Sequence, residues 1–260
     1  MGDQRMAGQK VAGQQVAGQN VKQIVLATRN PKKLDELRRI LAGRAAVLGR
    51  AAVLGQAAVL GQAAVLGQAA VLGQDGVPGQ ANVLGQIEVL GLDEVPAYDE
   101  TPEIGATFAE NALLKADDAV AHTGLPSVGD DSGLVVDALN GMPGVLSARW
   151  AGNRRDDAAN LDLVLEQLAD VPDQRRGASF VCAAALVTPE GIRLVREGRM
   201  AGQLIRERRG SNGFGYDPIF VPTGFRRTTA ELDPAAKDAI SHRGKALRAL
   251  LPFVRAATVG

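Results

Sequence analysis

The chain has 260 residues, of which 46% are hydrophobic and 22% charged, a composition typical of a globular protein. Lys plus Arg and Asp plus Glu number 29 each, so the formal net charge is zero, which argues against a protein that coats DNA or RNA. One Cys and two His argue against a Cys/His zinc cage, and no apolar run has the length of a membrane span. The N-terminus also lacks the apolar core of a signal peptide, so we expect a cytoplasmic protein with neither a membrane nor a nucleic-acid polymer as its partner.

The N-terminal part predicts a polar leader, then a strand and a helix. Residues 1–20 repeat the letters VAGQ, and we expect this leader to be poorly ordered. The segment VKQIVLAT predicts a short strand that ends near Thr28. Asn30 is a favourable N-cap and Pro31 a favourable first helical residue, so a helix should follow.

A six-residue repeat interrupts the chain after this helix. Residues 44–91 form eight units of the type QAAVLG, a period that fits the hexapeptide pattern of a left-handed β-helix. The alternative, which we favour, is tandem expansion of the last unit, QIEVLG, which has the pattern of an ordinary strand. The cost of closing a loop grows slowly with its length, so a domain can tolerate such an insert. We therefore expect one domain over residues 21–260, interrupted at about 44–85.

The remaining sequence mixes helices and strands, which predicts an α/β protein. Thr107 and Glu110 form a capping box at the start of the next helix. The buried apolar run around Cys182 indicates a strand with a structural thiol rather than a reactive one. In chain order we expect a helix within 106–124, a strand leading into residues 130–133, a helix over 158–169, a β-hairpin of 178–188 with 192–200, a short strand near 220, and helices around 237 and over 241–254.

Two groups of residues have the chemistry of an anion site and of a metal site. Thr28, Asn30 and Lys33 lie where a strand meets a helix, and a helix N-terminus favours an anion. The adjacent carboxylates of Asp130 and Asp131 would need a positive partner, which Mg²⁺ could supply. The alternatives are a capped helix with a solvated lysine for the first group and a solvated turn for the second.

Two further groups have the chemistry of a nucleotide site. Phe214, Gly215, Tyr216 and Asp217 form a Gly-rich aromatic loop in a chain with only 3% aromatic residues, and such a loop can stack on a flat ligand. Lys237 and the pair His242 and Arg243 offer donors for phosphate or carbonyl oxygens. The alternatives are a core hairpin for the loop and a polar helix start for the pair.

These motifs, in this order, resemble the inosine triphosphate pyrophosphatase family. The resemblance covers about residues 22–43 and 86–255, and is carried by LATRNPKK, TFAENALLKA, DDSGLVVDALNGMPGVLSARWAG, GFGYDPIF and KDAISHRGKAL. It implies an elongated mixed β-sheet with flanking helices, two lobes around a nucleotide cleft, and a homodimer. It also implies Mg²⁺-dependent hydrolysis of ITP, dITP and XTP to the monophosphate and pyrophosphate, which cleanses the nucleotide pool.

The resemblance also implies roles for individual residues. Asp131 would be the general base and, with Glu103, would bind Mg²⁺. Thr28, Asn30, Lys33 and Lys115 would hold the triphosphate. The other residues expected to bind the nucleotide are Ser132, Phe214, Gly215, Tyr216, Asp217, Lys237, His242 and Arg243.

Two other classes of function remain as rivals at this point. One makes the repeat the functional part, as a β-helix scaffold or acyltransferase. The other is a nucleotide-binding regulator without turnover. The preference between ITP and XTP stays open. The repeat lies between the first helix and Glu103, so Glu103 is the site residue whose position is hardest to predict.

Overall fold

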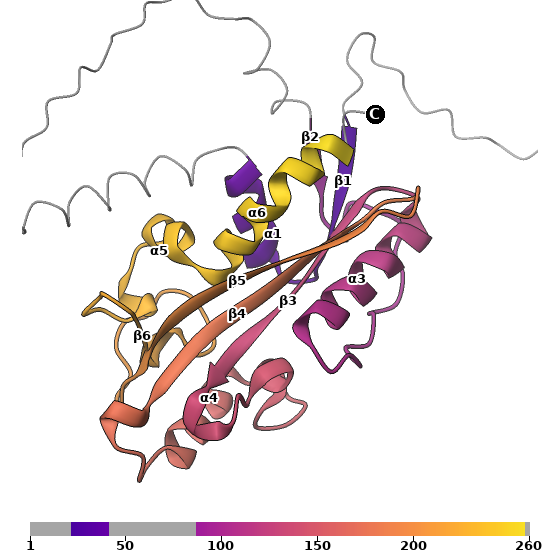
Figure 1. Cartoon of the computed structure of the whole chain (residues 1–260). Coiled ribbons are helices and arrows are strands. Elements are labelled where there is room, and N and C mark those ends of the chain that lie inside the picture. The colour runs from indigo at the N-terminus through magenta and orange to yellow at the C-terminus, as the bar shows by residue number, and fades with distance from the viewer. Residues whose placement is uncertain (1–21, 42–86, 258–260) are drawn as a thin grey trace, which may run out of the picture.

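The computed structural model describes residues 22–41 and 87–257 (Figure 1). The expected leader at 1–20 and the expected insert at about 44–85 lie outside the described residues. The elements with their bounds are β1 Lys22–Ala27, α1 Pro31–Leu41, β2 Ile87–Leu90, α3 Phe108–Thr123, β3 Ser127–Val136, α4 Asp157–Gln167, β4 Gly177–Val187, β5 Arg193–Leu204, β6 Phe220–Pro222, α5 Pro234–Ile240 and α6 His242–Ala257.

A single mixed sheet forms the frame of the molecule. Its six strands lie in the order β2-β1-β3-β4-β5-β6. The pairs of β1 with β2 and with β3 are parallel, and the pairs among β3, β4, β5 and β6 are antiparallel. The long strands β3, β4 and β5 run the length of the molecule, which is therefore elongated (Figure 1).

Helices cover both faces of the sheet because successive side chains of a strand point to opposite sides. On β4, Cys182 and Ala184 pack with α6, whereas Ala183 and Ala185 pack with α3. The two helices accordingly lie on opposite sides of the ribbon formed by β3, β4 and β5 (Figure 1). Cys182 is fully buried, as its apolar surroundings predict.

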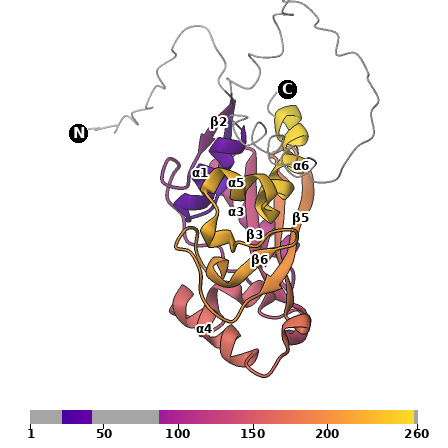
Figure 2. The same ribbon diagram turned by 90° about the vertical axis from the view of Figure 1, so that its left-hand side faces the viewer.

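A second core lies at the other end of the sheet. Leu161, Val164 and Leu168 of α4 and its C-terminal end pack against Phe180 and Phe220. The views in Figures 1 and 2 both show α4 at the end of the molecule away from α1 and the C-terminal end of α6. Helices thus gather at both ends of one sheet, and the middle of β3 lies between them.

The structure confirms the elements expected from the sequence and corrects one alternative. The capping box of Thr107 and Glu110 is present at the start of α3, and α1 begins at Pro31. The unit QIEVLG contains β2. The motif at Asp130 and Asp131 is not a solvated turn, because β3 runs through it and both side chains are buried.

Candidate functional site

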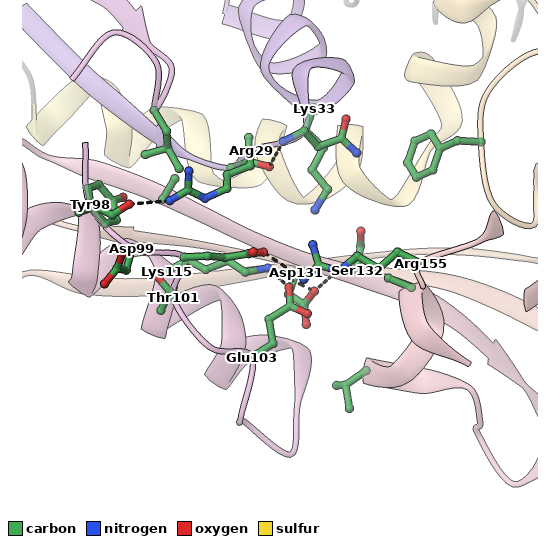
Figure 3. Close-up of a pocket in the computed structure, with 18 residues that line it drawn as sticks. Arg29, Lys33, Tyr98, Asp99, Thr101, Glu103, Lys115, Asp131, Ser132 and Arg155 are labelled. Atoms are coloured by element: carbon green, nitrogen blue, oxygen red, sulfur yellow. Dashed lines mark hydrogen bonds and ion pairs between the residues drawn. The ribbon is translucent and has the colours of Figure 1, made fainter. Parts of the chain in front are cut away.

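The junction of β1 and α1 forms one wall of a cavity of about 310 Å³, here called the phosphate-end cavity. Its lining includes Thr28, Asn30 and Lys33, as the sequence predicts. The Asn30 N–H donates to Thr28 Oγ1 over 3.2 Å, which fixes the turn into the helix. The N-terminal end of α1 therefore faces a hollow that also contains carboxylates, and Figure 3 shows this arrangement.

Asp130 obtains its positive partners from the protein itself. Lys33 Nζ lies 2.7 Å and Arg243 Nε 3.3 Å from Asp130 Oδ2, and the Asp130 side chain is 2% exposed. Burial alone would raise the pKa of Asp130, but Lys33 and Arg243 outweigh it and hold the pKa well below its ordinary value. Lys33 of α1 and Arg243 of α6 thus neutralise the negative charge of Asp130, for which the sequence suggested a metal ion.

Asp131 points to the opposite face of β3 and has a different environment. Asn111 Nδ2 donates to its Oδ2 over 3.0 Å, and the Ser132 N–H donates to its Oδ1 over 2.9 Å. Lys115 Nζ lies 3.7 Å from Oδ1. Burial raises the pKa of Asp131, Lys115 lowers it and Glu103 raises it again, so the pKa lies above its ordinary value. Asp131 is a positioned carboxylate with a strengthened affinity for a proton.

Glu103 lies beside Asp131 although the repeat precedes it in the sequence. Lys115 Nζ lies 2.5 Å from Glu103 Oε1, and Arg149 Nη1 lies 3.8 Å from Oε2. Burial raises the pKa of Glu103, but the charge of Lys115 is the main effect that holds it below the ordinary value. Figure 3 shows Glu103, Lys115 and Asp131 side by side in the cavity.

The pair of Glu103 and Asp131 has the donor chemistry that Mg²⁺ requires. Among residues 22–41 and 87–257, no cluster of three or more His, Cys, Asp or Glu side chains could hold a metal ion. Mg²⁺ needs fewer protein ligands, because it usually binds one or two carboxylates and keeps waters and phosphate oxygens. The two carboxylates share a hollow with Lys33 and Lys115, so the residues present fit a magnesium ion with a phosphate chain.

A second cavity of about 100 Å³, the base-end cavity, adjoins the first. Both cavities are lined by Ser132, Ala148 and Phe214. Lys237 Nζ lies 5.4 Å and Arg243 Cζ 5.9 Å from the centre of the Phe214 ring. An aromatic ring with two cations near it therefore lines both cavities, and the smaller cavity adds the aromatic side chains of Phe180 and Tyr216.

Comparisons with known proteins identify the family of this chain. The family model described as the Ham1 family matches residues 77–253. This chain belongs to the Ham1 family. It is 65% identical over 153 residues to a dITP/XTP pyrophosphatase of Mycobacteroides abscessus, a match that covers 59% of this chain and 74% of that protein. A dITP/XTP pyrophosphatase of Mycobacterium tuberculosis is 61% identical over 158 residues, covering 61% of this chain and 77% of its own length.

Solved structures with the same fold include two Ham1-type proteins. The nucleoside-triphosphatase, or dITP/XTP pyrophosphatase, from Mycobacterium abscessus is 52% identical, with a TM-score of 0.62 over 88% of this chain and 99% of that one. The Ham1 protein of Staphylococcus aureus is 31% identical, with a TM-score of 0.68 over 90% of this chain and 99% of that one. The elongated α/β fold expected from the sequence is thereby confirmed.

In this Ham1-family chain, the polar side-chain atoms of Tyr216 and Asp217, both expected to bind the nucleotide, bond to other parts of the protein. The Tyr216 hydroxyl donates to the Ser147 carbonyl over 2.8 Å. Asp217 Oδ1 accepts from Thr229 Oγ1 over 2.7 Å, and Oδ2 accepts from the Phe214 N–H over 2.9 Å and from Lys237 Nζ. Both residues line the base-end cavity. The bonds of Asp217 favour a role in positioning Phe214 and Lys237, and the bond of Tyr216 anchors its ring to the Ser147 backbone.

Gly215, His242 and Arg243 also line the base-end cavity. The Gly215 N–H donates to Asp157 Oδ2 over 2.9 Å, which ties the aromatic loop to α4. His242 stacks on Phe180 with a centroid distance of 5.0 Å, and burial with the nearby Arg243 holds its pKa well below the ordinary value. Arg243 Nη2 donates to Ser132 Oγ over 2.8 Å, so this arginine contacts both the Asp130 carboxylate and the Ser132 hydroxyl.

The structure adds residues that the expected site did not contain. Asn111 orients Asp131, and a signal for it exists, because it lies four residues before Lys115 on the same helix. Arg29 and Arg155 line the phosphate-end cavity. Arg29 lies within the motif LATRNPKK but received no role from it, and Arg155 lies outside every quoted motif. The site therefore contains more positive charge than the motifs suggest.

Proposed function

We propose that this chain hydrolyses non-canonical purine nucleoside triphosphates (ITP, dITP and XTP) to the monophosphate and pyrophosphate. The observation that carries the proposal is the pair of adjoining cavities that meet at Phe214 and Ser132. The larger one has lysines that suit a phosphate chain and carboxylates that suit its Mg²⁺, and the smaller one has aromatic side chains that suit a planar base. The names of the relatives, dITP/XTP pyrophosphatases, support the same activity.

Different residues bind the phosphate chain and the purine. The N-terminal end of α1, with Thr28 and Asn30, binds phosphate oxygens, and Lys33 and Lys115 offset their charge. Phe214 stacks on the purine, and Asp217 holds both Phe214 and Lys237 in place through the bonds described above. His242 Nδ1 is buried without a hydrogen-bond partner among the described residues, so His242 is a candidate to face the base.

Asp131 acts on the water that attacks the α-phosphorus. Asn111 and the Ser132 N–H fix the direction of its carboxylate, and its raised pKa favours acceptance of the water's proton. The bond from the water oxygen to the α-phosphorus forms as the bond to the bridging oxygen breaks, and pyrophosphate leaves. Lys33 and Lys115 stabilise the charge that grows on the departing oxygens.

Mg²⁺ is the cofactor that this proposal includes, with Glu103 and Asp131 as its protein ligands. When bound, the ion would supply positive charge to phosphate oxygens and would acidify a bound water. Selectivity for a 6-oxo purine follows if Arg243 or His242 donates to O6, because an amine at this position would leave the donor unpaired.

The proposal also places the protein in the cytoplasm and makes it a homodimer. No helix among the described residues is long and apolar enough to cross a membrane.

A nucleotide panel tests the activity. The purified chain is incubated with ITP, XTP, dITP, GTP and ATP and Mg²⁺, and pyrophosphate and orthophosphate are measured separately. We expect pyrophosphate from ITP, dITP and XTP and far slower release from ATP and GTP. No turnover with any of them would leave a nucleotide-binding regulator, and orthophosphate as the first product would indicate a different phosphatase.

The repeat-based alternative, a β-helix scaffold or acyltransferase, receives no support from the comparisons. The family match runs through the C-terminal motifs, and the structural relatives are Ham1-type proteins. The division into a leader, an insert at 44–85 and a domain over 21–260 remains part of our proposal.

A further inference from the structure

Arg155 lines the phosphate-end cavity and lies just before α4. It lies two residues before Asp157, whose carboxylate accepts the Gly215 N–H, so its backbone is tied to the aromatic loop. Its side chain lines the phosphate-end cavity, and Nη2 lies 3.0 Å from Glu100 Oε1. Figure 3 shows Arg155 in the same hollow as Asp131 and Ser132.

Glu100 belongs to the opposite wall, on the loop between β2 and α3. The same loop carries Glu103, and Arg29 Nη2 holds it by donating to the Tyr98 carbonyl over 2.7 Å. The ion pair of Glu100 and Arg155 therefore joins the two walls of the cavity. The charge of Arg155 also contributes to the lowered pKa of Glu103, so the guanidinium acts on the part of the cavity where the carboxylates lie.

This ion pair has the properties of an exchangeable contact rather than of a structural one. The two side chains are 60% and 56% exposed, and exposed pairs contribute little to stability. A guanidinium binds phosphate oxygens through a planar fork of donors, which suits it to the substrate class of this cavity. The backbone of Arg155 has φ 52°, an unusual conformation for a residue other than glycine, and this conformation sets the direction of the side chain.

We propose that Arg155 binds the terminal phosphate of the nucleotide and that Glu100 holds its guanidinium until that phosphate displaces the carboxylate. The inference deepens the proposed function, since it assigns a contact to the same substrate. Glu100 then competes with the nucleotide for Arg155. Loss of Arg155 should weaken binding, whereas loss of the Glu100 charge should strengthen it. If the ion pair only held the two walls of the cavity together, both losses would instead change the nucleotide affinity in the same direction.

Binding measurements with three variants test this assignment without requiring turnover. Isothermal titration calorimetry with Mg²⁺ compares inosine 5′-[α,β-imido]triphosphate with inosine 5′-[α,β-imido]diphosphate, for the wild type and for Arg155→Gln, Glu100→Gln and Arg154→Gln. Arg154 is the matched control, because it is an exposed arginine on the same loop and does not line the cavity. Thermal melting of each variant verifies that it is folded.

We expect Arg155→Gln to weaken the triphosphate analogue about tenfold, the effect of one charged hydrogen-bonding contact at a partly exposed site, and to leave the diphosphate nearly unchanged. Glu100→Gln should tighten the triphosphate analogue by about two- to threefold, as for one exposed ion pair. Arg154→Gln should change neither.

Other patterns would overturn the assignment. One is weaker triphosphate binding in both Arg155→Gln and Glu100→Gln. Another is an equal loss of affinity for the diphosphate and for the triphosphate in Arg155→Gln. The others are a loss of triphosphate affinity in Arg154→Gln as large as that in Arg155→Gln, and no binding by the wild type. Pyrophosphate release from ITP by the wild type is measured alongside. If the expected binding pattern is found but no pyrophosphate is released, the proposed hydrolysis is rejected and the role of Arg155 is retained. If pyrophosphate is released but the binding pattern is not found, the role of Arg155 is rejected and the hydrolysis is retained.

Discussion

Asp130 and Asp131 are neighbours on β3, yet the structure gives their carboxylates opposite surroundings. Asp130 faces Lys33 and Arg243, and its pKa is lowered. Asp131 faces Asn111 and the cavity, and its pKa is raised. Two carboxyl groups in different environments can take different roles, one as a structural anion and the other as a proton acceptor.

Replacement of Asp131 by Asn should lower kcat for ITP by about a hundredfold or more, because the general base is lost. The melting temperature should not fall, because a carboxyl group with a raised pKa is itself unfavourable in the native state when it is ionised. Steady-state kinetics and thermal melting measure the two effects. Asp99→Asn is the control, since Asp99 also lines the cavity but is exposed. A near-normal rate for Asp131→Asn would remove Asp131 from this role.

Replacement of Asp130 by Asn should instead lower the stability, by about 3 kcal/mol, because it leaves the buried Arg243 and the mostly buried Lys33 without this charged partner. The lowered pKa of Asp130 means that its stabilising contribution is fully present above about pH 4, the ordinary Asp value, and is lost as the pH falls further. The difference in urea midpoint between the wild type and the variant should therefore narrow below pH 4. An unchanged midpoint at pH 7 would contradict the buried pairing.

At the scale of elements, caps and periodicity determine most of what the sequence can predict. The capping box, Pro31 and the apolar spacing of α4 locate helices, because they depend on residues within one or two turns. The family motifs also contain many of the residues that line the two cavities. The partners within the site do not follow from such patterns. Arg243 and Asp130 are 113 residues apart, and only the packing of α6 on the sheet brings them together.

The assignment of single residues shows the same limit. Tyr216 and Asp217 belong to the aromatic motif, yet their polar atoms bond to Ser147, Thr229 and the loop itself. A motif shows that residues act together, but it does not show which of them face the ligand. Arg155 is the reverse case, because it lines the cavity without belonging to any pattern in the sequence.

The contact of α3 with β3 places Asn111 and Lys115 beside Asp131, and Gly129 makes this contact possible. A Cβ at Gly129 would lie 2.2 Å from the Ala112 carbonyl oxygen and 2.9 Å from the Ala116 nitrogen. Gly129→Ala should therefore push α3 outward, at a cost of about 1–3 kcal/mol in stability and with a lower kcat for ITP. Gly198→Ala is the matched comparison, since its Cβ would meet the His242 carbonyl oxygen of α6 at 2.1 Å.

Gly198→Ala should disturb the base end and raise the KM for ITP more than it lowers kcat. Urea unfolding and steady-state kinetics on both variants separate the effects. If Gly129→Ala keeps the wild-type kcat and stability, the close approach of α3 does not position the catalytic group.

At the scale of the whole molecule, all residues assigned to the site lie outside the repeat. Deletion of residues 44–80 should therefore leave ITP hydrolysis largely intact. The remaining connection between Leu41 of α1 and Ile87 of β2 would have eight residues, and a chain of this length spans up to about 26 Å. The rate of pyrophosphate release, with circular dichroism as the test of folding, measures the outcome. A folded deletion variant without activity would restore the repeat as a functional element.

The central claim is that the two cavities hold a purine nucleotide so that water reaches the α-phosphorus beside Asp131. Hydrolysis of ITP in water enriched in ¹⁸O, followed by mass spectrometry of the products, tests this most directly. The account requires the label in inosine monophosphate and none in the newly released pyrophosphate. Label in pyrophosphate or orthophosphate would show attack on another phosphorus and would contradict the arrangement.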